Sequence, residues 1–269
     1  MGITLLFDRK LELITESKYR FAKEEGVEIE FKYTTMDKSG IPTAEITIMN
    51  LDREARNLIK KEKASLSIGY GEMFGELIFG DIKNIDLSDE PEITFDLVSN
   101  GYSFSRNFSK HYDRQVREGY MIRDICRNFN VKISGSELLD TYYQANGISV
   151  SGNVLNTITK ICNNRGLGVT TRGETIVIYD LKEKDTKKAG NIMLNVTSGL
   201  TNCVKYVADD EEDKEKYDYI VKALPIPGLT QGDLVKVEHD NFNGIVQIKD
   251  FVIYGRKNWT SEYYVKVVG

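Results

Sequence analysis

The chain has 269 residues and a mass of 30.6 kDa, and its 41% hydrophobic and 29% charged residues are typical of a folded chain with a substantial core, which excludes global disorder. Its 36 Lys and Arg against 41 Asp and Glu give a net charge of −5, which argues against a nucleic-acid coat protein because such a protein needs a basic face. No apolar run approaches the ~20 residues that span a bilayer, and Asp8 and Glu12 fall where a secretion signal would have its apolar core, so neither membrane insertion nor secretion is expected.

The first hundred residues predict a β unit. Residues 27–34 and 43–49 alternate apolar and polar side chains with the period of a half-buried strand. A short helix is expected after Asn50 or Asp52, because acidic residues come early in it and lysines come late. The predicted strands of this unit are residues 27–34, 43–49, 64–70, 76–87 and 92–98, with a hairpin turn over 71–74.

The middle of the chain predicts a small α/β domain. Residues 117–129 and 153–164 carry apolar side chains at helical spacing, and each segment is followed by a short β segment. Residues 182–190 are charged and end in glycine, which is typical of a solvated linker.

After this linker the β pattern returns. The predicted strands are residues 192–196, 201–207, 217–224, 234–238, 245–254 and 261–268. The sequence therefore predicts a mainly β fold with an α+β insert. We expect a first β domain over 1–100, the insert over 101–189 and a second β domain over 190–269.

Cysteine and histidine are scarce. Cys126, Cys162 and Cys203 are odd in number and lack paired spacing, so they predict buried thiols in a reducing compartment rather than a disulfide framework. His111 and His239 have no second His or Cys at metal-ligand spacing, so no zinc site and no other cofactor is expected.

Motifs that could carry chemistry are weak. Residues 69–75 are rich in glycine like a phosphate loop, but a strand follows them where a helix is required, so a hairpin is predicted. Ser105 and Ser109 lie near His111 without a third orienting group, which favours a surface histidine over a nucleophile pair. Because the chain has 41 acidic residues, a pair of catalytic carboxylates like that of a glycosidase stays open as an alternative. No Asp or Glu stands in a plainly apolar stretch, which would be the sign of a raised pKa.

The order of a β unit, a two-helix insert and a second β unit resembles the baseplate hub family of contractile-tailed phages and phage-tail-like bacteriocins. Relatives in that family are the late control protein D group and the trimeric hub of T-even phages. The residues that carry the resemblance are strand, turn and packing features rather than catalytic ones. They are AEITIMNLDREARNLIKK (44–61), SLSIGYGE (65–72), GELIFGDI (75–82), Tyr219–Leu224, Pro227–Leu229, Gly232, Asp233, Gly244 and Trp259–Glu262.

The resemblance implies a homotrimeric structural hub that is not an enzyme and needs no cofactor. Such a hub is a symmetry adaptor between the hexameric tail tube and the trimeric spike, with the tape-measure protein and the baseplate wedge as further partners. It implies a component of a phage virion or a bacteriocin particle, assembled in the cytoplasm of the bacterial host.

Two polar loops, 35–42 and 208–216, are expected to contact neighbouring rings or to stay mobile, and ordinary surface loops remain the alternative. A calcium site in the acidic run 209–215 is disfavoured because the run lacks the ligand spacing and the glycine turn of a calcium loop. The candidate interface residues are Asp37, Lys38, Ser39, Asp209, Asp210, Glu211, Glu212 and Asp213.

A hexameric tube that meets a trimeric spike needs an adaptor with two equivalent docking surfaces per subunit. We therefore expect the two β units, about 1–100 and 190–269, to share one small barrel topology with each other and with the tube protein. The alternative is two unrelated β folds that pack together, and different strand orders would favour it.

Two other functions stay open at this point. A cell-wall hydrolase delivered at the tail tip would need a catalytic acid. A carbohydrate-binding β module would display an aromatic platform, for which Trp259, the single tryptophan, is the candidate.

Overall fold

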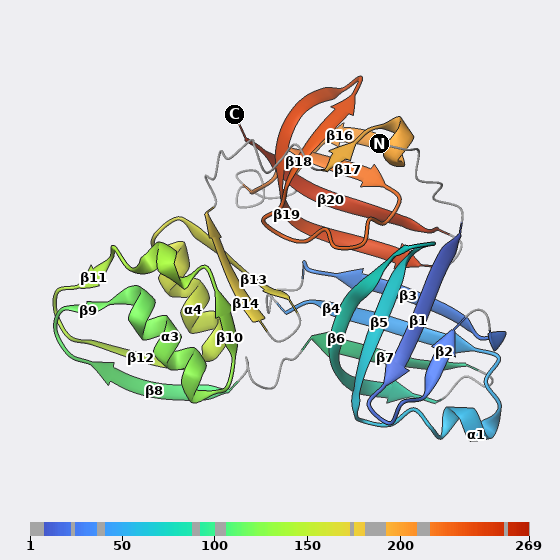
Figure 1. Ribbon diagram of the computed structural model, residues 1–269, viewed down its shortest axis with the longest axis horizontal. Coiled ribbons are helices and arrows are strands. Elements are labelled where there is room, and N and C mark those ends of the chain that lie inside the picture. Colours follow the sequence, from blue (N-terminus) through green and yellow to red (C-terminus); the bar gives the residue numbers. More distant parts are fainter. Residues whose placement is uncertain are drawn as a thin grey trace. The chain divides into compact units, whose positions relative to one another are not determined.

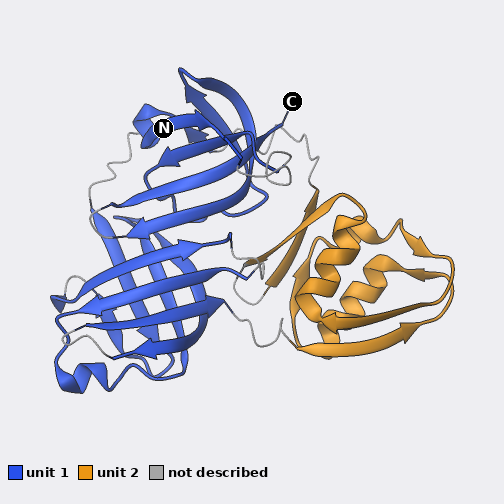
Figure 2. Ribbon diagram, turned by 180° about the vertical axis from the view of Figure 1, so that it is seen from behind, with its two compact units in different colours: residues 1–99, 184–269 blue, residues 100–183 orange. Residues whose placement is uncertain are grey.

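The computed structural model describes residues 8–22, 25–36, 41–87, 92–99, 106–172, 175–180, 192–208, 216–255 and 258–268. Its contacts divide the chain into two compact units (Figure 2). Unit one combines Met1–Ser99 with Lys184–Gly269, and unit two is Asn100–Glu183. The chain is mainly β, as its alternating segments predict.

The N-terminal half of unit one is a curled sheet (Figure 1, blue to teal). Its strands are β1 (Arg9–Thr15), β2 (Arg20–Ala22), β3 (Glu28–Thr34), β4 (Thr43–Met49), β5 (Lys63–Tyr70), β6 (Met73–Asp86) and β7 (Ile93–Ser99). All five strands predicted here are confirmed, and β1 and β2 are additional. The short helix α1 (Arg53–Arg56) also forms, and the side chain of Asp52 caps it by accepting a bond of 2.7 Å from the backbone N–H of Ala55.

The C-terminal half of unit one is a second curled sheet (Figure 1, orange to red). Its elements are β15 (Met193–Leu194), the 3-10 turn η3 (Val196–Ser198), β16 (Leu200–Lys205), β17 (Tyr219–Ala223), β18 (Leu234–His239), β19 (Phe242–Gly255) and β20 (Thr260–Val267). Each strand falls on a predicted segment, although β15 is shorter and β19 longer than expected, and the turn η3 was not predicted. Residues 182–190, the predicted linker, lie outside the described part of the chain.

The two halves have the same strand order. Numbered along the chain without the three-residue β2, the six strands are β1 and β3–β7 in the first half and β15–β20 in the second. In both sheets the spatial order of these six strands is 1-4-5-6-3-2. All neighbouring pairs are antiparallel except β15 with β18, which is parallel. Antiparallel pairing of β3 with β19 joins them into one sheet of 13 strands.

One apolar cluster runs through both halves of unit one. The alternation of each strand puts every second side chain into it, as expected for sheets with one buried face. Fully buried members include Leu13, Ile46 and Leu66 from the first half and Ile248 and Tyr263 from the second.

In its described residues, unit two has two α-helices and three small sheets. Its elements are β8 (Asn107–Tyr112), β9 (Val116–Arg117), α3 (Glu118–Asn128), β10 (Lys132–Ser134), η2 (Ser136–Leu139), β11 (Tyr143–Gln144), β12 (Ile148–Asn153), α4 (Val154–Asn163), β13 (Leu167–Arg172) and β14 (Thr175–Asp180). Both helices were predicted from their apolar spacing, and the side chain of Asn153 caps α4 through the backbone N–H of Asn156 at 3.1 Å.

A buried carboxylate at the start of α3 in unit two forms an ion pair with Arg165. Glu118 begins α3 and is 2% exposed, and both of its carboxylate oxygens accept bonds from Arg165, at 2.9 and 2.6 Å. Gln144 donates a third bond of 2.6 Å, and the Arg165 guanidinium lies 4.7 Å from the ring centroid of Tyr142. The charge is thus fully paired, as a buried carboxylate requires.

Candidate assembly surface

The contact between β3 and β19 joins the two halves of unit one. Residues Phe31–Thr34 pair antiparallel with Val252–Gly255. The ladder continues at Thr35, whose N–H donates to the carbonyl oxygen of Phe251 at 3.1 Å and whose Oγ1 accepts from the N–H of Phe251 at 2.8 Å. The rings of Tyr33 and Phe251 are 5.4 Å apart. The halves are therefore held by a backbone ladder with an apolar inner face.

Trp259 packs inside this junction. Its ring meets Phe31 and Tyr70 nearly edge to face, with centroids 6.2 Å away in both cases, and its Nε1–H donates to the Tyr70 hydroxyl at 2.7 Å. Burial raises the pKa of Tyr70 to about 12. The side chain of Trp259 is 6% exposed. It is therefore a packing residue, and the aromatic platform that a sugar-binding module would need is not formed by it.

A polar cluster around Asp250 lies at the same junction. This carboxylate, 4% exposed, stands at a bulge in β19. It accepts bonds from the Tyr217 hydroxyl at 2.6 Å and from Gln231 Nε2 at 2.8 Å, and it pairs with Lys216 Nζ at 2.9 Å. The Thr35 hydroxyl lies 3.3 Å away. The donors compensate the cost of burying the charge.

Each of the two loops predicted to serve assembly has one end beside this cluster. Thr35 is the first residue of loop 35–42, Lys216 is the last residue of loop 208–216, and Tyr217 follows it; all three contact Asp250. The candidate residues themselves lie outside the described part of the chain: Asp37, Lys38, Ser39, Asp209, Asp210, Glu211, Glu212 and Asp213. Sequence reasoning missed this convergence, although a lone Asp250 inside an apolar strand was a visible signal.

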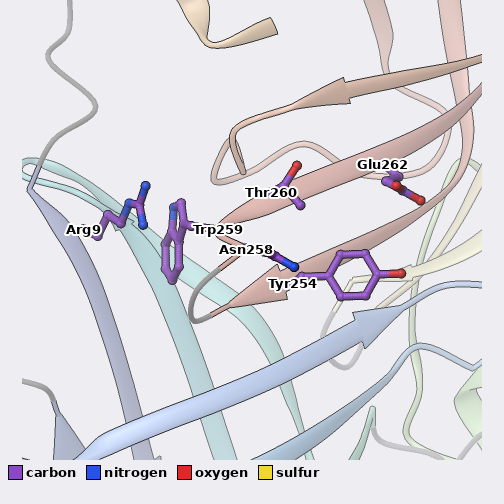
Figure 3. Close-up of a pocket in the computed structure, with 6 residues that line it drawn as sticks. All are labelled: Arg9, Tyr254, Asn258, Trp259, Thr260 and Glu262. Atoms are coloured by element: carbon purple, nitrogen blue, oxygen red, sulfur yellow. The ribbon is translucent and has the colours of Figure 1, made fainter. Parts of the chain in front are cut away.

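A shallow pocket of about 440 Å³ lies beside Trp259 (Figure 3). Its lining residues are Arg9, Tyr254, Asn258, Trp259, Thr260 and Glu262. The Arg9 guanidinium lies 5.8 Å from the ring centroid of Trp259. The lining offers hydrogen-bond donors and acceptors but neither histidine nor cysteine. Within the described ranges, no three His, Cys, Asp or Glu side chains gather closely enough to hold a metal ion.

The histidines take part in local contacts. His111 Nδ1 lies 2.9 Å from the hydroxyl of Ser149 on β12, the strand opposite. Ser105 lies outside the described residues. His239 Nδ1 accepts a bond of 3.1 Å from the N–H of Asn241 in the turn after β18. Both histidines therefore have the local, surface character that the sequence predicted.

The cysteines are buried free thiols, as their odd number and unpaired spacing predicted. Burial raises the pKa of Cys126 and of Cys162 to about 12. A thiol that stays protonated at neutral pH is a poor nucleophile, so these side chains act as core residues.

The fifth strands of the two halves match in detail. β6 and β19 each have 14 residues and each follow a two-residue turn. Counted from that turn, the third residue is glycine in both, Gly75 and Gly244, and the ninth is aspartate in both, Asp81 and Asp250. The tenth, Ile82 or Phe251, is buried in the common core. The correspondence indicates that the halves are equivalent in residue position as well as in strand order.

No family model and no curated protein matches the sequence. Solved structures do match, at low identity. A 43 kDa tail protein of prophage MuSo2 from Shewanella oneidensis is 12% identical with a TM-score of 0.63, and a tail protein from Neisseria meningitidis is 9% identical with a TM-score of 0.64. Each alignment covers 97% of both chains.

A third match is the E. coli c3393 protein, described as a type VI secretion component with structural similarity to the T4 tail proteins gp27 and gp5. It is 11% identical with a TM-score of 0.56, over 90% of this chain and 73% of that chain. No described helix is long and apolar enough to cross a membrane. Over nearly its whole length, the chain has the fold of phage tail proteins.

Proposed function

We propose that the chain is a baseplate hub protein. Three copies form a ring on the tail axis that joins the hexameric tail tube to the trimeric spike. The tape-measure protein and the baseplate wedge are further partners, and the ring is part of a phage or bacteriocin particle assembled in the bacterial cytoplasm. The protein acts through shape and contact, without a catalytic step.

The observation that carries this proposal is the strand order that the two halves of unit one share. Two equivalent halves in each of three copies supply six similar docking positions. A threefold assembly can then match a sixfold ring on one side and a threefold partner on the other. Similarity in fold to phage tail proteins, and to a type VI secretion component described as structurally similar to gp27, supports the same assignment.

Light scattering of the purified full chain tests the trimer. We expect a mass of three times the 30.6 kDa chain, and a stable monomer at micromolar concentration would contradict it. A zymogram on purified cell wall tests the proposal that the protein does not hydrolyse cell wall. We expect no cleared band, and a cleared band at the position of this chain would favour the hydrolase.

A further inference from the structure

We propose that two neighbouring pockets of unit one form a single binding site for a neutral oligosaccharide, with the ring of Tyr254 between them. The first is the pocket beside Trp259, and the second lies over β3 and β4. The site belongs to one chain, so it does not depend on the number of copies in the proposed hub.

The two pockets share one wall. The first has a volume of about 440 Å³ (Figure 3) and the second about 380 Å³, and Tyr254 and Asn258 line both. The second pocket is completed by Glu30, Phe31, Lys32, Glu45, Thr47 and Gly255. Each volume falls in the range of ~300–1,000 Å³ that is usual for small-molecule sites. Because the wall is shared, one ligand can occupy both pockets.

Strand pairing fixes the side chains that surround Tyr254. Thr260 on β20 and Lys32 on β3 lie directly opposite Tyr254, one on each side, and Glu45 on β4 lies opposite Lys32. Directly opposite residues of a sheet point to the same face. The four side chains therefore form one row across four strands, on the face that points away from the apolar cluster of unit one.

Each pocket contains a cation, at least one carboxylate and a threonine hydroxyl. They are Arg9, Glu262 and Thr260 in the first pocket and Lys32, Glu30, Glu45 and Thr47 in the second. An anionic ligand would be repelled by the carboxylates, and a cationic ligand would be repelled by Arg9 and Lys32. A neutral ligand with many hydroxyl groups can use the donors and the acceptors together, because each hydroxyl both donates and accepts.

One of the carboxylates is held in place before a ligand arrives. Lys222 on β17 forms an ion pair of 2.7 Å with Glu262. An ionised carboxylate has about four lone-pair positions, so Glu262 can still accept bonds from a ligand. A side chain that is already fixed loses less rotamer freedom on binding, which favours affinity.

The ring of Tyr254 supplies the apolar contact of the site. Its side chain is partly exposed, whereas its chain neighbours Ile253 and Gly255 are buried. A sugar ring carries C–H groups on its faces, and an aromatic ring with an apolar body and a polar tip packs well against such a face. Trp259 is buried and offers no open ring face, so Tyr254 takes the part of the aromatic platform.

The backbone beneath the pockets is already paired. The strands β20, β19, β3 and β4 each lie between two other strands of the large sheet. An extended peptide that binds by adding a strand needs the edge of a sheet, and these four strands are interior ones. The ligand is therefore bound by side chains, which favours a compact molecule rich in hydroxyl groups over an extended peptide.

The single tryptophan provides a direct readout of binding. Trp259 lines the first pocket, so a ligand bound there changes the surroundings and the fluorescence emission of its indole. The full chain is screened on an array of short neutral oligomers of glucose, mannose and N-acetylglucosamine together with acidic oligosaccharides. A neutral oligomer that binds is then titrated into the chain, and we expect a saturable change in emission.

Variants of the shared wall locate the ligand. We expect Tyr254→Ala to lower the affinity about tenfold and Tyr254→Phe, which keeps the ring, to stay within about twofold of the parent. Lys32→Ala tests the second pocket at an exposed position and should lower the affinity by about threefold or more. The matched control is Tyr120→Ala, because Tyr120 is 53% exposed on α3 of unit two. Circular dichroism checks that each variant is folded.

Three results would overturn the site. They are an array on which no neutral oligomer is bound, a bound oligomer that leaves the emission of Trp259 unchanged, and an affinity that is the same in the parent, Tyr254→Ala and Lys32→Ala. Light scattering of the same samples separates this outcome from the proposed hub. A trimer that binds no oligosaccharide overturns the site and leaves the hub intact, whereas a monomer that binds one supports the site and contradicts the hub.

Discussion

The two halves of unit one share a strand order but differ in how that order is stabilised. Asp81 and Asp250 are both the ninth residue of their fifth strand. Asp250 is 4% exposed with four polar partners, whereas Asp81 is only partly buried. The two halves therefore share a strand order without sharing polar contacts: the buried polar cluster forms at the aspartate that lies where the halves join.

The largest expected effect follows from removing the carboxylate at this junction. Asp250→Ala removes a strong acceptor from the Tyr217 hydroxyl and the Gln231 amide and ends the ion pair with the half-exposed Lys216, so we expect a loss of about 2–4 kcal/mol in the free energy of unfolding. Urea denaturation measures it. The matched variant Asp81→Ala is expected to cost under about 1 kcal/mol. Equal losses would show that the two positions are energetically alike and would remove the contrast.

A smaller effect on stability is expected when alanine replaces Gly255, with the same change at Gly75 for comparison. A Cβ on Gly255 would meet the ring of Phe31 at 1.9 Å, whereas one on Gly75 would meet no atom within 4 Å. We expect Gly255→Ala to lower the free energy of unfolding by about 1–3 kcal/mol, because the junction must open to accept the methyl group. Gly75→Ala serves as the control. Thermal unfolding that is unchanged in both variants would mean that the junction has room that the structure does not show.

Asp124 in unit two is expected to make stability sensitive to acid. Burial opposes ionisation of Asp124, but bonds from Lys110 at 2.6 Å and from the Tyr112 hydroxyl at 2.6 Å lower its pKa overall. Because folding lowers this pKa, the stabilisation is present above the unfolded value of about 3.9 and is lost as the pH falls through the folded value. Asp124→Asn should therefore flatten the stability profile below about pH 4. A profile identical to that of the parent chain would exclude Asp124 as its source.

The smallest effect on stability is expected from the acidic loop. Deleting residues 209–214 should leave the melting temperature nearly unchanged, because Tyr217 and Lys216 beyond the deletion still hold the strand at Asp250. The same deletion should alter assembly, read out as a change in mass by light scattering. Loss of soluble expression would instead make the loop part of the fold.

Much of the fold could be predicted because its strands alternate plainly and both helices of unit two carry apolar stripes. β1 was not predicted although Leu11 and Leu13 alternate with charged neighbours, because the alternation covers only a few residues and Ile14, next to Leu13, interrupts it. β8 and β12 were missed because they are mostly exposed and lack a buried period. Periodicity reports burial, so strands with little buried surface leave a weak signal.

The candidate site was harder to predict. The pairing of β3 with β19 joins residues more than two hundred positions apart, and no local pattern encodes such a register. The burial of Trp259 follows from this pairing, since its partners Phe31 and Tyr70 come from the other half. Sequence reasoning suggested that the halves would be equivalent; it did not identify the surface where they meet.

Electron microscopy of the purified full chain tests the central claim most directly. If the two halves are equivalent positions in a trimeric ring, averaged end-on views should show threefold symmetry with six similar lobes around a central opening. A particle with a single lobe per copy, or one without threefold symmetry, would contradict the account.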